Sequence, residues 1–223
     1  MKRIIVAIDG PAGAGKSTIA RRIAELAGFT YIDTGAMYRA VGLWALRSDV
    51  GLADMHKLEE LAKAARIAFL DGGRGIQLNG ENITAEIRSP EVSAAASKVA
   101  AVSAVRRALV EKQREIAADN SVVMEGRDIG TVVFPEAQVK IFLDADPIVR
   151  AERRVKDLGT GDTAQVAKEI AERDSRDRSR PDSPMVQAPD AVYLDSSRLS
   201  VEEVELAILK LIREKTSNGK EIH

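Results

Sequence analysis

The segment from Gly10 to Ser17 reads Gly-Pro-Ala-Gly-Ala-Gly-Lys-Ser and fits the pattern G-x-x-x-x-G-K-[ST] at every position. Its glycines let backbone N–H groups approach phosphate oxygens, and the start of a following helix favours negative charge. Lys16 would add a positive charge near the terminal phosphates, and the Ser17 hydroxyl is placed to ligate Mg²⁺. A glycine-rich turn without a ligand is the alternative, but a strand pattern before the segment and a helix pattern after it favour a phosphate-binding loop. The expected nucleotide contacts are Gly10, Pro11, Ala12, Gly13, Ala14, Gly15, Lys16, Ser17 and Thr18.

The nucleotide at this loop is expected to be ATP. The sequence contains neither the Asn-Lys-x-Asp segment that specifies guanine nor an Asp-x-x-Gly switch segment, and both are typical of GTPases. The loop alone does not name a reaction, because GTPases, motor ATPases and small-molecule kinases share it. Other residues must therefore identify the acceptor.

Arginines gather at the predicted ends of strands and helices. They lie in the segments 33–39, 125–130 and 173–180. A guanidinium binds phosphate oxygens through two parallel hydrogen bonds, which lysine cannot do. Because ligands bind at the carboxyl edge of a parallel sheet, a set of residues should converge near the phosphate loop. This set is Thr34, Arg39, Arg127 and Asp128. For segment 173–180 alone, a solvated helix face carrying ion pairs is an equally good interpretation.

The chain offers few side chains for general-base or nucleophilic catalysis. It contains no cysteine and two histidines, His56 and His223. A kinase that acts on an alcohol must manage a hydroxyl proton, whereas a nucleoside monophosphate presents an oxygen that is already anionic, since its second pKa is about 6. Many arginines without a catalytic histidine therefore fit transfer between two phosphate groups, in which the protein cancels repulsion and aligns the reactants.

Composition is typical of a globular protein that binds small molecules. The 223 residues are 45% hydrophobic, and 33 Lys and Arg against 34 Asp and Glu give a net charge of -1. This balance does not favour nucleic acid or an anionic membrane as a partner. The absence of cysteine suits a reducing cytosol, and the apolar run Ile4 to Ile8 is too short for a signal peptide or a membrane span. We expect a cytoplasmic monomer that binds nucleotides.

The predicted elements form an α/β sheet with helices on both faces. Apolar runs predict strands at 4–8, 30–32, 122–124, 141–143 and 192–194, and helical spacing predicts helices at 16–28, 36–46, 91–118 and from about 201. Turn signals between residues 66 and 84 predict a small antiparallel insertion. Gly159 to Asp162 is expected to be a mobile loop, and Thr216 to His223 a frayed tail.

Six segments occur along the chain in a characteristic order. They are Ile-Asp-Gly-Pro-Ala-Gly-Ala-Gly-Lys-Ser-Thr (8–18), Asp-Thr-Gly-Ala-Met-Tyr-Arg (33–39), Glu-Ile-Arg (86–88), Glu-Gly-Arg-Asp-Ile-Gly-Thr-Val-Val-Phe-Pro (125–135), Lys-Ile-Phe-Leu-Asp-Ala (140–145) and the arginine cluster 173–180. Together they resemble the bacterial cytidylate kinases over nearly the whole chain. Many families share the phosphate loop, whereas segment 125–135 and the insertion before it are much more specific.

This resemblance implies a fold and an activity. The fold would be that of a P-loop kinase, with a five-stranded parallel sheet, within a single domain over residues 1–223. An acceptor-side insertion would lie at about 61–90 and a short lid at about 150–163. The activity would be transfer of the γ-phosphoryl group of ATP to CMP or dCMP, with Mg²⁺ accompanying the ATP.

The resemblance also implies roles for individual residues. The acceptor phosphate would be held by Thr34, Arg39, Arg127 and Arg180, the cytosine edge by Ser97, Arg106 and Asp128, and the sugar by Arg173 and Asp177 together with Ser97. The lid arginines Arg150, Arg153 and Arg154 would contact the donor phosphates, so the expected catalytic residues are Lys16, Arg127, Arg150 and Arg154. Besides Ser17, Glu125 takes a position where related kinases have a carboxylate near Mg²⁺ waters, and an ordinary acid at a strand end explains it equally well.

Two other functions stay open at this point. A kinase for a hydroxyl acceptor such as shikimate would share the phosphate loop but would have no use for the cytosine-directed set Ser97, Arg106 and Asp128. A nucleotide-binding regulator would bind ATP tightly and transfer phosphate to no monophosphate. The complete set of active-site segments argues against the regulator.

Overall fold

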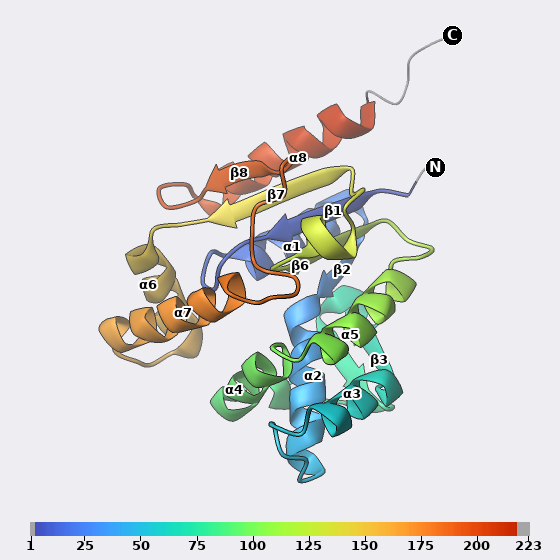
Figure 1. Cartoon of the computed structure of the whole chain (residues 1–223). Helices are drawn as coiled ribbons and strands as arrows, with labels where there is room; N and C mark the ends of the chain where they lie inside the picture. The colour runs from blue at the N-terminus through green and yellow to red at the C-terminus, as the bar shows by residue number, and fades with distance from the viewer. Residues whose placement is uncertain (1–2, 218–223) are drawn as a thin grey trace. The chain divides into compact units, whose positions relative to one another are not determined.

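The computed structural model describes residues 3–217, and its main sheet has five parallel strands (Figure 1). In spatial order the strands are β2 (Thr30–Asp33), β6 (Val122–Gly126), β1 (Ile5–Asp9), β7 (Val139–Asp144) and β8 (Val192–Asp195). The register pairs Ile5 with Val122 and Ile141 with Val192. The predicted five-stranded parallel sheet is confirmed.

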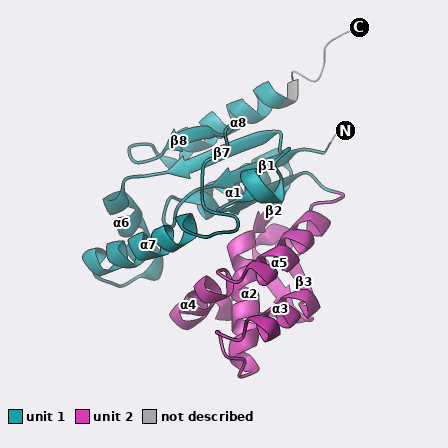
Figure 2. Ribbon diagram, viewed as in Figure 1, with its two compact units in different colours: residues 1–31, 120–223 teal, residues 32–119 magenta. Residues whose placement is uncertain are grey.

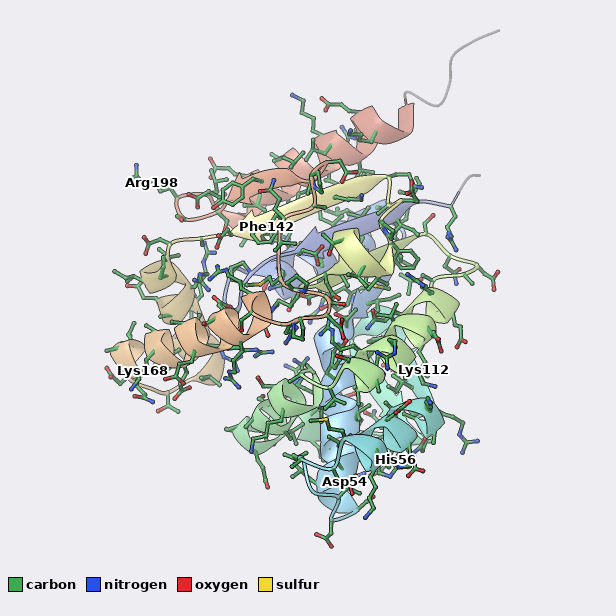
Figure 3. All side chains as sticks on the ribbon, viewed as in Figure 1. Asp54, His56, Lys112, Phe142, Lys168 and Arg198 are labelled. Atoms are coloured by element: carbon green, nitrogen blue, oxygen red, sulfur yellow. The ribbon has the colours of Figure 1, made fainter. Side chains whose placement is uncertain are left out.

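The burial of each strand follows its place in the sheet. Every residue of β1 and β6 is buried, as expected for continuous apolar runs in strands that are covered on both faces. In β8, which lies at one edge, Val192 and Tyr193 are exposed. The Tyr193 ring stacks on Phe142 of β7 with 6.2 Å between the ring centroids, and Phe142 is labelled in Figure 3. The sheet therefore has its most deeply buried strands where the phosphate loop begins.

Four α-helices within residues 3–217 complete this part of the fold. They are α1 (Lys16–Ala27), α6 (Pro147–Leu158), α7 (Thr163–Arg178) and α8 (Val201–Ser217). Ile23 of α1 and Ile208 of α8 share an apolar cluster with Ile8 of β1, so these two helices cover the sheet. Among residues 3–217, no helix is long and apolar enough to cross a membrane.

The chain separates into two compact units (Figure 2). The first takes the described residues up to Tyr31 and from Asn120 onward, and the second takes Ile32–Asp119. The second unit contains the helices α2 (Thr34–Arg47), α3 (Met55–Ala64), α4 (Pro90–Val99) and α5 (Ser103–Ile116), the antiparallel strands β3 (Ile67–Leu70), β4 (Gly75–Leu78) and β5 (Glu81–Asn82), and the 3-10 turns η1 (Asp71–Gly73) and η2 (Glu86–Arg88). The predicted antiparallel sheet is thus confirmed.

Several element boundaries differ from the sequence prediction. The single helix predicted over residues 91–118 is wrong, because α4 ends at Val99 and the extended backbone of Val102 precedes α5. A π-helical turn, η3 (Ile129–Val133), follows β6 where nothing helical was predicted. Helix α8 runs to Ser217, so residues 216 and 217, which were predicted to belong to a frayed tail, are helical. Residues 218–223, the rest of that predicted segment, lie outside the described part.

The loop between α6 and α7 is set by signals at both of its ends. Gly159 ends α6 in a left-handed conformation with φ of 72°, which glycine adopts without strain. The Asp162 side chain then accepts a hydrogen bond from the Gln165 N–H at 3.1 Å and caps the start of α7. The predicted loop over Gly159 to Asp162 therefore lies between two defined helix ends.

Candidate active site

The phosphate loop connects β1 to α1 and lies against other backbone on its outer side. Gly10 has φ of 147°, and a Cβ atom there would stand 2.0 Å from the carbonyl oxygen of Leu143 in β7. Gly13 has φ of 77°, and its Cβ would stand 2.6 Å from the carbonyl oxygen of Arg150 in α6. Only glycine fits both positions, because the obstructing atoms belong to the main chain. The loop is therefore held in one path by close packing.

Lys16, the first residue of α1, is buried beneath this loop. Its Nζ donates a hydrogen bond to the carbonyl oxygen of Pro11 at 2.6 Å, and the residue is 6% exposed. Burial and the nearby positive charge of Arg127 lower the pKa of Lys16 to about 7, against the opposing effect of the Glu125 carboxylate. The negative charge of a bound polyphosphate could therefore offset both effects that disfavour the protonated form of Lys16.

A cavity of about 450 Å³ opens beside the loop and the first turn of α1. It is lined by the segment from Gly13 to Ile19, by Arg153, Arg154, Lys156 and Asp157 of α6, and by Ser196, Leu199, Ser200, Val201 and Val204 around the start of α8. Ser17 and Thr18 are exposed within this lining, as their predicted contact with a nucleotide requires. The lining combines cationic side chains of α6 with apolar side chains around the start of α8, which suits a triphosphate joined to a base.

The three lid arginines have different surroundings. Arg153 donates to the side-chain and main-chain oxygens of Ser196 at 2.9 and 2.8 Å. Arg154 lines the cavity, whereas Arg150 is 6% exposed and does not appear among the lining residues. Arg150 instead donates to the main-chain oxygens of Ala12 and Ala145. Arg154 is therefore better placed than Arg150 for the predicted contact with donor phosphates.

Two buried carboxylates stand near the ends of the central strands. Asp9, the last residue of β1, accepts hydrogen bonds from the N–H groups of Ile129 and Gly130 at 2.8 and 2.7 Å, which ties the strand to η3. Burial raises the pKa of Asp9 to about 6, although these two hydrogen bonds oppose the shift. Glu125 of β6 accepts a hydrogen bond from the Tyr31 hydroxyl at 2.6 Å.

Arg127, Asp177 and Arg180 form a compact ionic cluster in the first unit. The Nε of Arg127 donates to one Asp177 oxygen at 2.9 Å, and Arg180 donates to the other. Burial alone would raise the pKa of Asp177, but the two guanidiniums outweigh it and hold this pKa below its ordinary value. Three of the predicted acceptor contacts are therefore brought together. Asp128 is buried beside Arg127 in sequence, and Arg173 is half-buried on α7.

The remaining predicted acceptor contacts lie in the second unit. Thr34 is buried at the start of α2, and Arg39, one turn later, forms an ion pair with Asp33 at 2.7 Å. The Arg106 guanidinium lies 5.6 Å from the centroid of the Tyr38 ring and is 4% exposed. Ser97 is half-buried on α4. Thus α2, α4 and α5 each carry at least one of these residues.

Some residues that shape the site were not predicted from the sequence. Asp174 is 1% exposed on α7 and contacts the phosphate loop, and Ser196 is 3% exposed and holds Arg153. Asp9 could have been found, because it is the first polar residue after a buried apolar run. His56, the histidine within residues 3–217, is exposed on α3 and has no place in this chemistry (Figure 3).

Comparisons with known proteins identify the family of this chain. A family model described as "Cytidylate kinase" matches residues 6–214. The chain is 59% identical to a protein of Solibacter usitatus (strain Ellin6076) named "Cytidylate kinase", over 226 aligned positions that cover 99% of this chain and 97% of the other.

Solved structures show the same fold at low sequence identity. An uncharacterized protein from Eubacterium ventriosum ATCC 27560 has a TM-score of 0.55 and 14% identity, covering 94% of this chain and 98% of its own. A gluconokinase from Sinorhizobium meliloti 1021 has a TM-score of 0.50 and 16% identity, covering 99% of this chain and 98% of its own.

Proposed function

This chain belongs to the cytidylate kinase family, and we propose that it transfers the γ-phosphoryl group of ATP to CMP or dCMP, giving ADP and CDP or dCDP. The observation that carries the proposal is the full-length match to this family together with an intact phosphate loop. The loop accounts for the donor, and the arginine cluster on the same unit accounts for a phosphate-bearing acceptor.

The donor is proposed to occupy the cavity beside the phosphate loop. Backbone N–H groups of the loop and the N-terminus of α1 would face its β- and γ-phosphates. Lys16 would leave its hydrogen bond to Pro11 and contact the phosphates, because their charge offsets the desolvation of its ammonium group. Arg154 would contact the same phosphates from α6, and the apolar side chains around the start of α8 would receive the base.

The acceptor phosphate is proposed to bind the guanidiniums of Arg127 and Arg180. Asp177 keeps both groups oriented and partly neutralised, so that they can exchange part of their pairing for phosphate oxygens. Thr34 and Arg39 would contribute further contacts to the phosphate, and Ser97, Arg106 and Asp128 would address the cytosine edge. Arg173 and Asp177 would contact the sugar.

The transfer needs no general base. An oxygen of the CMP phosphate, already anionic at neutral pH, attacks the γ-phosphorus, the bond from that phosphorus to the β–γ bridging oxygen breaks, and ADP leaves with the electron pair. Lys16 and the arginines cancel repulsion between the two anionic substrates and stabilise the charge on the transferred group. Their rigid placement supplies the in-line alignment.

Mg²⁺ is proposed to enter together with ATP. Within residues 3–217 no three His, Cys, Asp or Glu side chains are grouped as a metal cage, which fits an ion held chiefly by nucleotide phosphates. The exposed hydroxyl of Ser17 would be its direct protein ligand, and Glu125 would contact it through water. When bound, the ion neutralises phosphate charge and orients the transferred group.

An ADP-release assay with ATP and a panel of monophosphates tests the proposal. CMP and dCMP should stimulate ADP formation far more than UMP or AMP at equal concentration. A clear preference for AMP would overturn the acceptor assignment. ATP binding with no turnover on any member of the panel would instead identify a nucleotide-binding protein without this activity.

A further inference from the structure

Asp174 of α7 is a buried carboxylate in direct contact with the phosphate loop. Its Oδ1 accepts a hydrogen bond from the Ala12 N–H at 3.0 Å, and its Oδ2 accepts one from Nη1 of Arg150 at 2.5 Å. The proposed reaction assigns no role to this residue. We propose that Asp174 is a positioning residue for the phosphate loop and acts on donor binding through Ala12 and Arg150. This inference rests on the proposed function above.

Arg150 completes a closed set of contacts around one peptide of the loop. Its Nη1 donates to the carbonyl oxygen of Ala12 at 2.9 Å, and its Nε donates to that of Ala145 at 3.1 Å. Both polar main-chain groups of Ala12 are therefore engaged by the Asp174–Arg150 pair. Because adjoining peptides share a backbone, fixing Ala12 also fixes the direction of the N–H groups that follow it toward the phosphates.

The backbone of Arg150 packs directly against the phosphate loop, so a shift of Arg150 would also shift the loop. A Cβ on Gly13 would lie 2.6 Å from the Arg150 carbonyl oxygen and 3.0 Å from its Cβ, so the loop rests on the backbone of α6. The side chain of Arg150 is 7% exposed and that of Asp174 is 1% exposed. The pair is thus shielded from solvent, where a charge-assisted hydrogen bond is strong and geometrically specific.

The same helix also reaches the acceptor side of the proposed reaction. Three residues after Asp174, Asp177 holds Arg127 and Arg180. A single stretch of α7 therefore fixes the phosphate loop at one turn and two acceptor arginines at the next. Phosphoryl transfer depends on the distance between these groups, and a misplacement of about 1 Å can cost about a hundredfold in rate.

The two roles that the Asp174 carboxylate could have, as a negative charge near the phosphates or as a positioning group, predict opposite changes in ATP affinity when Asp174 is substituted. As a charge, the carboxylate repels a polyphosphate, so its removal should tighten ATP binding. As a positioning residue, its removal should weaken ATP binding, because the loop loses a fixed path. An Asp174→Asn variant keeps the shape of the side chain but replaces one accepting oxygen with an NH₂ group, which can only donate. It can therefore accept from Ala12 or from Arg150 through its oxygen, but cannot accept through both ends as the carboxylate does.

The test measures ATP and CMP binding separately by calorimetry on the full-length chain. Asp174→Asn should weaken ATP binding at least about tenfold and leave CMP binding within about twofold, as expected for loss of a charge-assisted contact. Asp174→Glu keeps the charge and displaces it by one methylene, so it should also weaken ATP binding. If Asp174→Asn does not fold, the ATP affinity of Asp174→Glu tests the proposal in its place.

Val166→Ala on the same helix is the matched control. Val166 is buried in an apolar cluster against which Ala12 also packs, and its side chain carries no polar group. Its truncation therefore loosens apolar packing beside the loop but leaves the hydrogen bonds of Asp174 in place, so it should lower the melting temperature and leave ATP affinity within about twofold. Unchanged or tighter ATP binding in the Asp174 variants overturns the proposal, as does an equal loss in Val166→Ala. Because ATP binding is measured without acceptor, a wild-type chain that fails to phosphorylate CMP would refute the proposed function and leave this comparison valid.

Discussion

Arg127 links the site residues of the first unit, since it pairs with Asp177 and lies close enough to Lys16 to lower the pKa of that lysine. Arg127→Ala should lower kcat/KM for CMP at least about tenfold, because a charge-assisted phosphate contact is worth about 1.5–3 kcal/mol. Steady-state rates with CMP varied at saturating ATP measure this effect.

The matched control for Arg127 is a cation on the surface of α7. Lys168, which Figure 3 shows on that helix, is exposed, so Lys168→Ala should leave kcat/KM within about twofold. Wild-type kinetics in a folded Arg127→Ala protein would refute the phosphate contact.

Lys16 should make ATP binding depend on pH in a defined direction. In the protein alone its pKa is lowered to about 7, chiefly by burial, so the amine is mostly neutral at pH 8 and mostly protonated at pH 6. Bound phosphates raise this pKa again, so ATP binding should take up about one proton at pH 8 and far less at pH 6. Calorimetry in buffers of different ionisation enthalpy counts these protons. Equal proton uptake at the two pH values, or full uptake in a Lys16→Arg variant, would contradict the assignment.

At the scale of elements, the phosphate loop depends on the strand that faces its first glycine. In Gly10→Ala the new Cβ would lie 2.0 Å from the Leu143 carbonyl oxygen. Both atoms are attached directly to the main chain, so no side-chain rotation can relieve the clash. The strained backbone should cost at least about 1–3 kcal/mol in the free energy of unfolding and should abolish tight ATP binding. Urea unfolding measures the first effect.

Gly51 provides the comparison for Gly10. It lies in the second unit, and among residues 3–217, apart from Gly51 itself and the two residues next to it in the chain, no heavy atom comes within 4 Å of the point that a Cβ atom on Gly51 would occupy. Its φ is not in the left-handed region. Gly51→Ala should therefore change the free energy of unfolding by less than about 0.5 kcal/mol. A Gly10→Ala protein as stable as Gly51→Ala would show that the close approach of β7 to the loop is not rigid.

The elements also show where sequence patterns suffice and where they do not. The apolar run Ile4 to Ile8 predicts a strand, yet β1 is Ile5–Asp9, because Asp9 is stabilised in the sheet by two N–H groups from η3 that are 120 and 121 residues away in sequence. The break between α4 and α5, residues 100–102, contains no glycine or proline that would have predicted it. Val99 and Val105 are both completely buried in one cluster, and this tertiary packing outweighs the helical propensity of the alanines.

Some site residues can be predicted from a local motif, whereas others depend on contacts between distant segments. Lys16 and Ser17 follow from a local motif whose spacing fixes their roles. Asp174 stands in a run of alternating charges, and i,i+4 spacing predicts an ion-paired surface there but cannot tell which carboxylate is buried. Arg150 was predicted to contact donor phosphates, and its burial against Ala12 depends on contacts between segments 138 residues apart. The choice of cytosine likewise comes from family resemblance and not from physical pattern.

At the scale of the whole molecule, substrate binding should stabilise the folded chain. A ligand that binds only the folded state adds RT ln(1 + [L]/Kd), which is about 2.7 kcal/mol at a hundred times Kd. CMP at that concentration should therefore raise the melting temperature by several degrees, and AMP at the same concentration should raise it much less. Thermal unfolding followed by circular dichroism measures both. Equal shifts with CMP and AMP would contradict specific recognition of cytosine.

The central claim is direct transfer from ATP to a cytidine monophosphate, and the fate of a labelled γ-phosphate tests it most directly. ATP labelled in the γ-phosphoryl group is incubated with the chain and CMP, and the products are separated by chromatography. Direct transfer predicts that the label appears in the β-phosphate of CDP, in a one-to-one ratio with ADP. Label recovered as inorganic phosphate, or CMP left unchanged while ADP accumulates, would contradict the account.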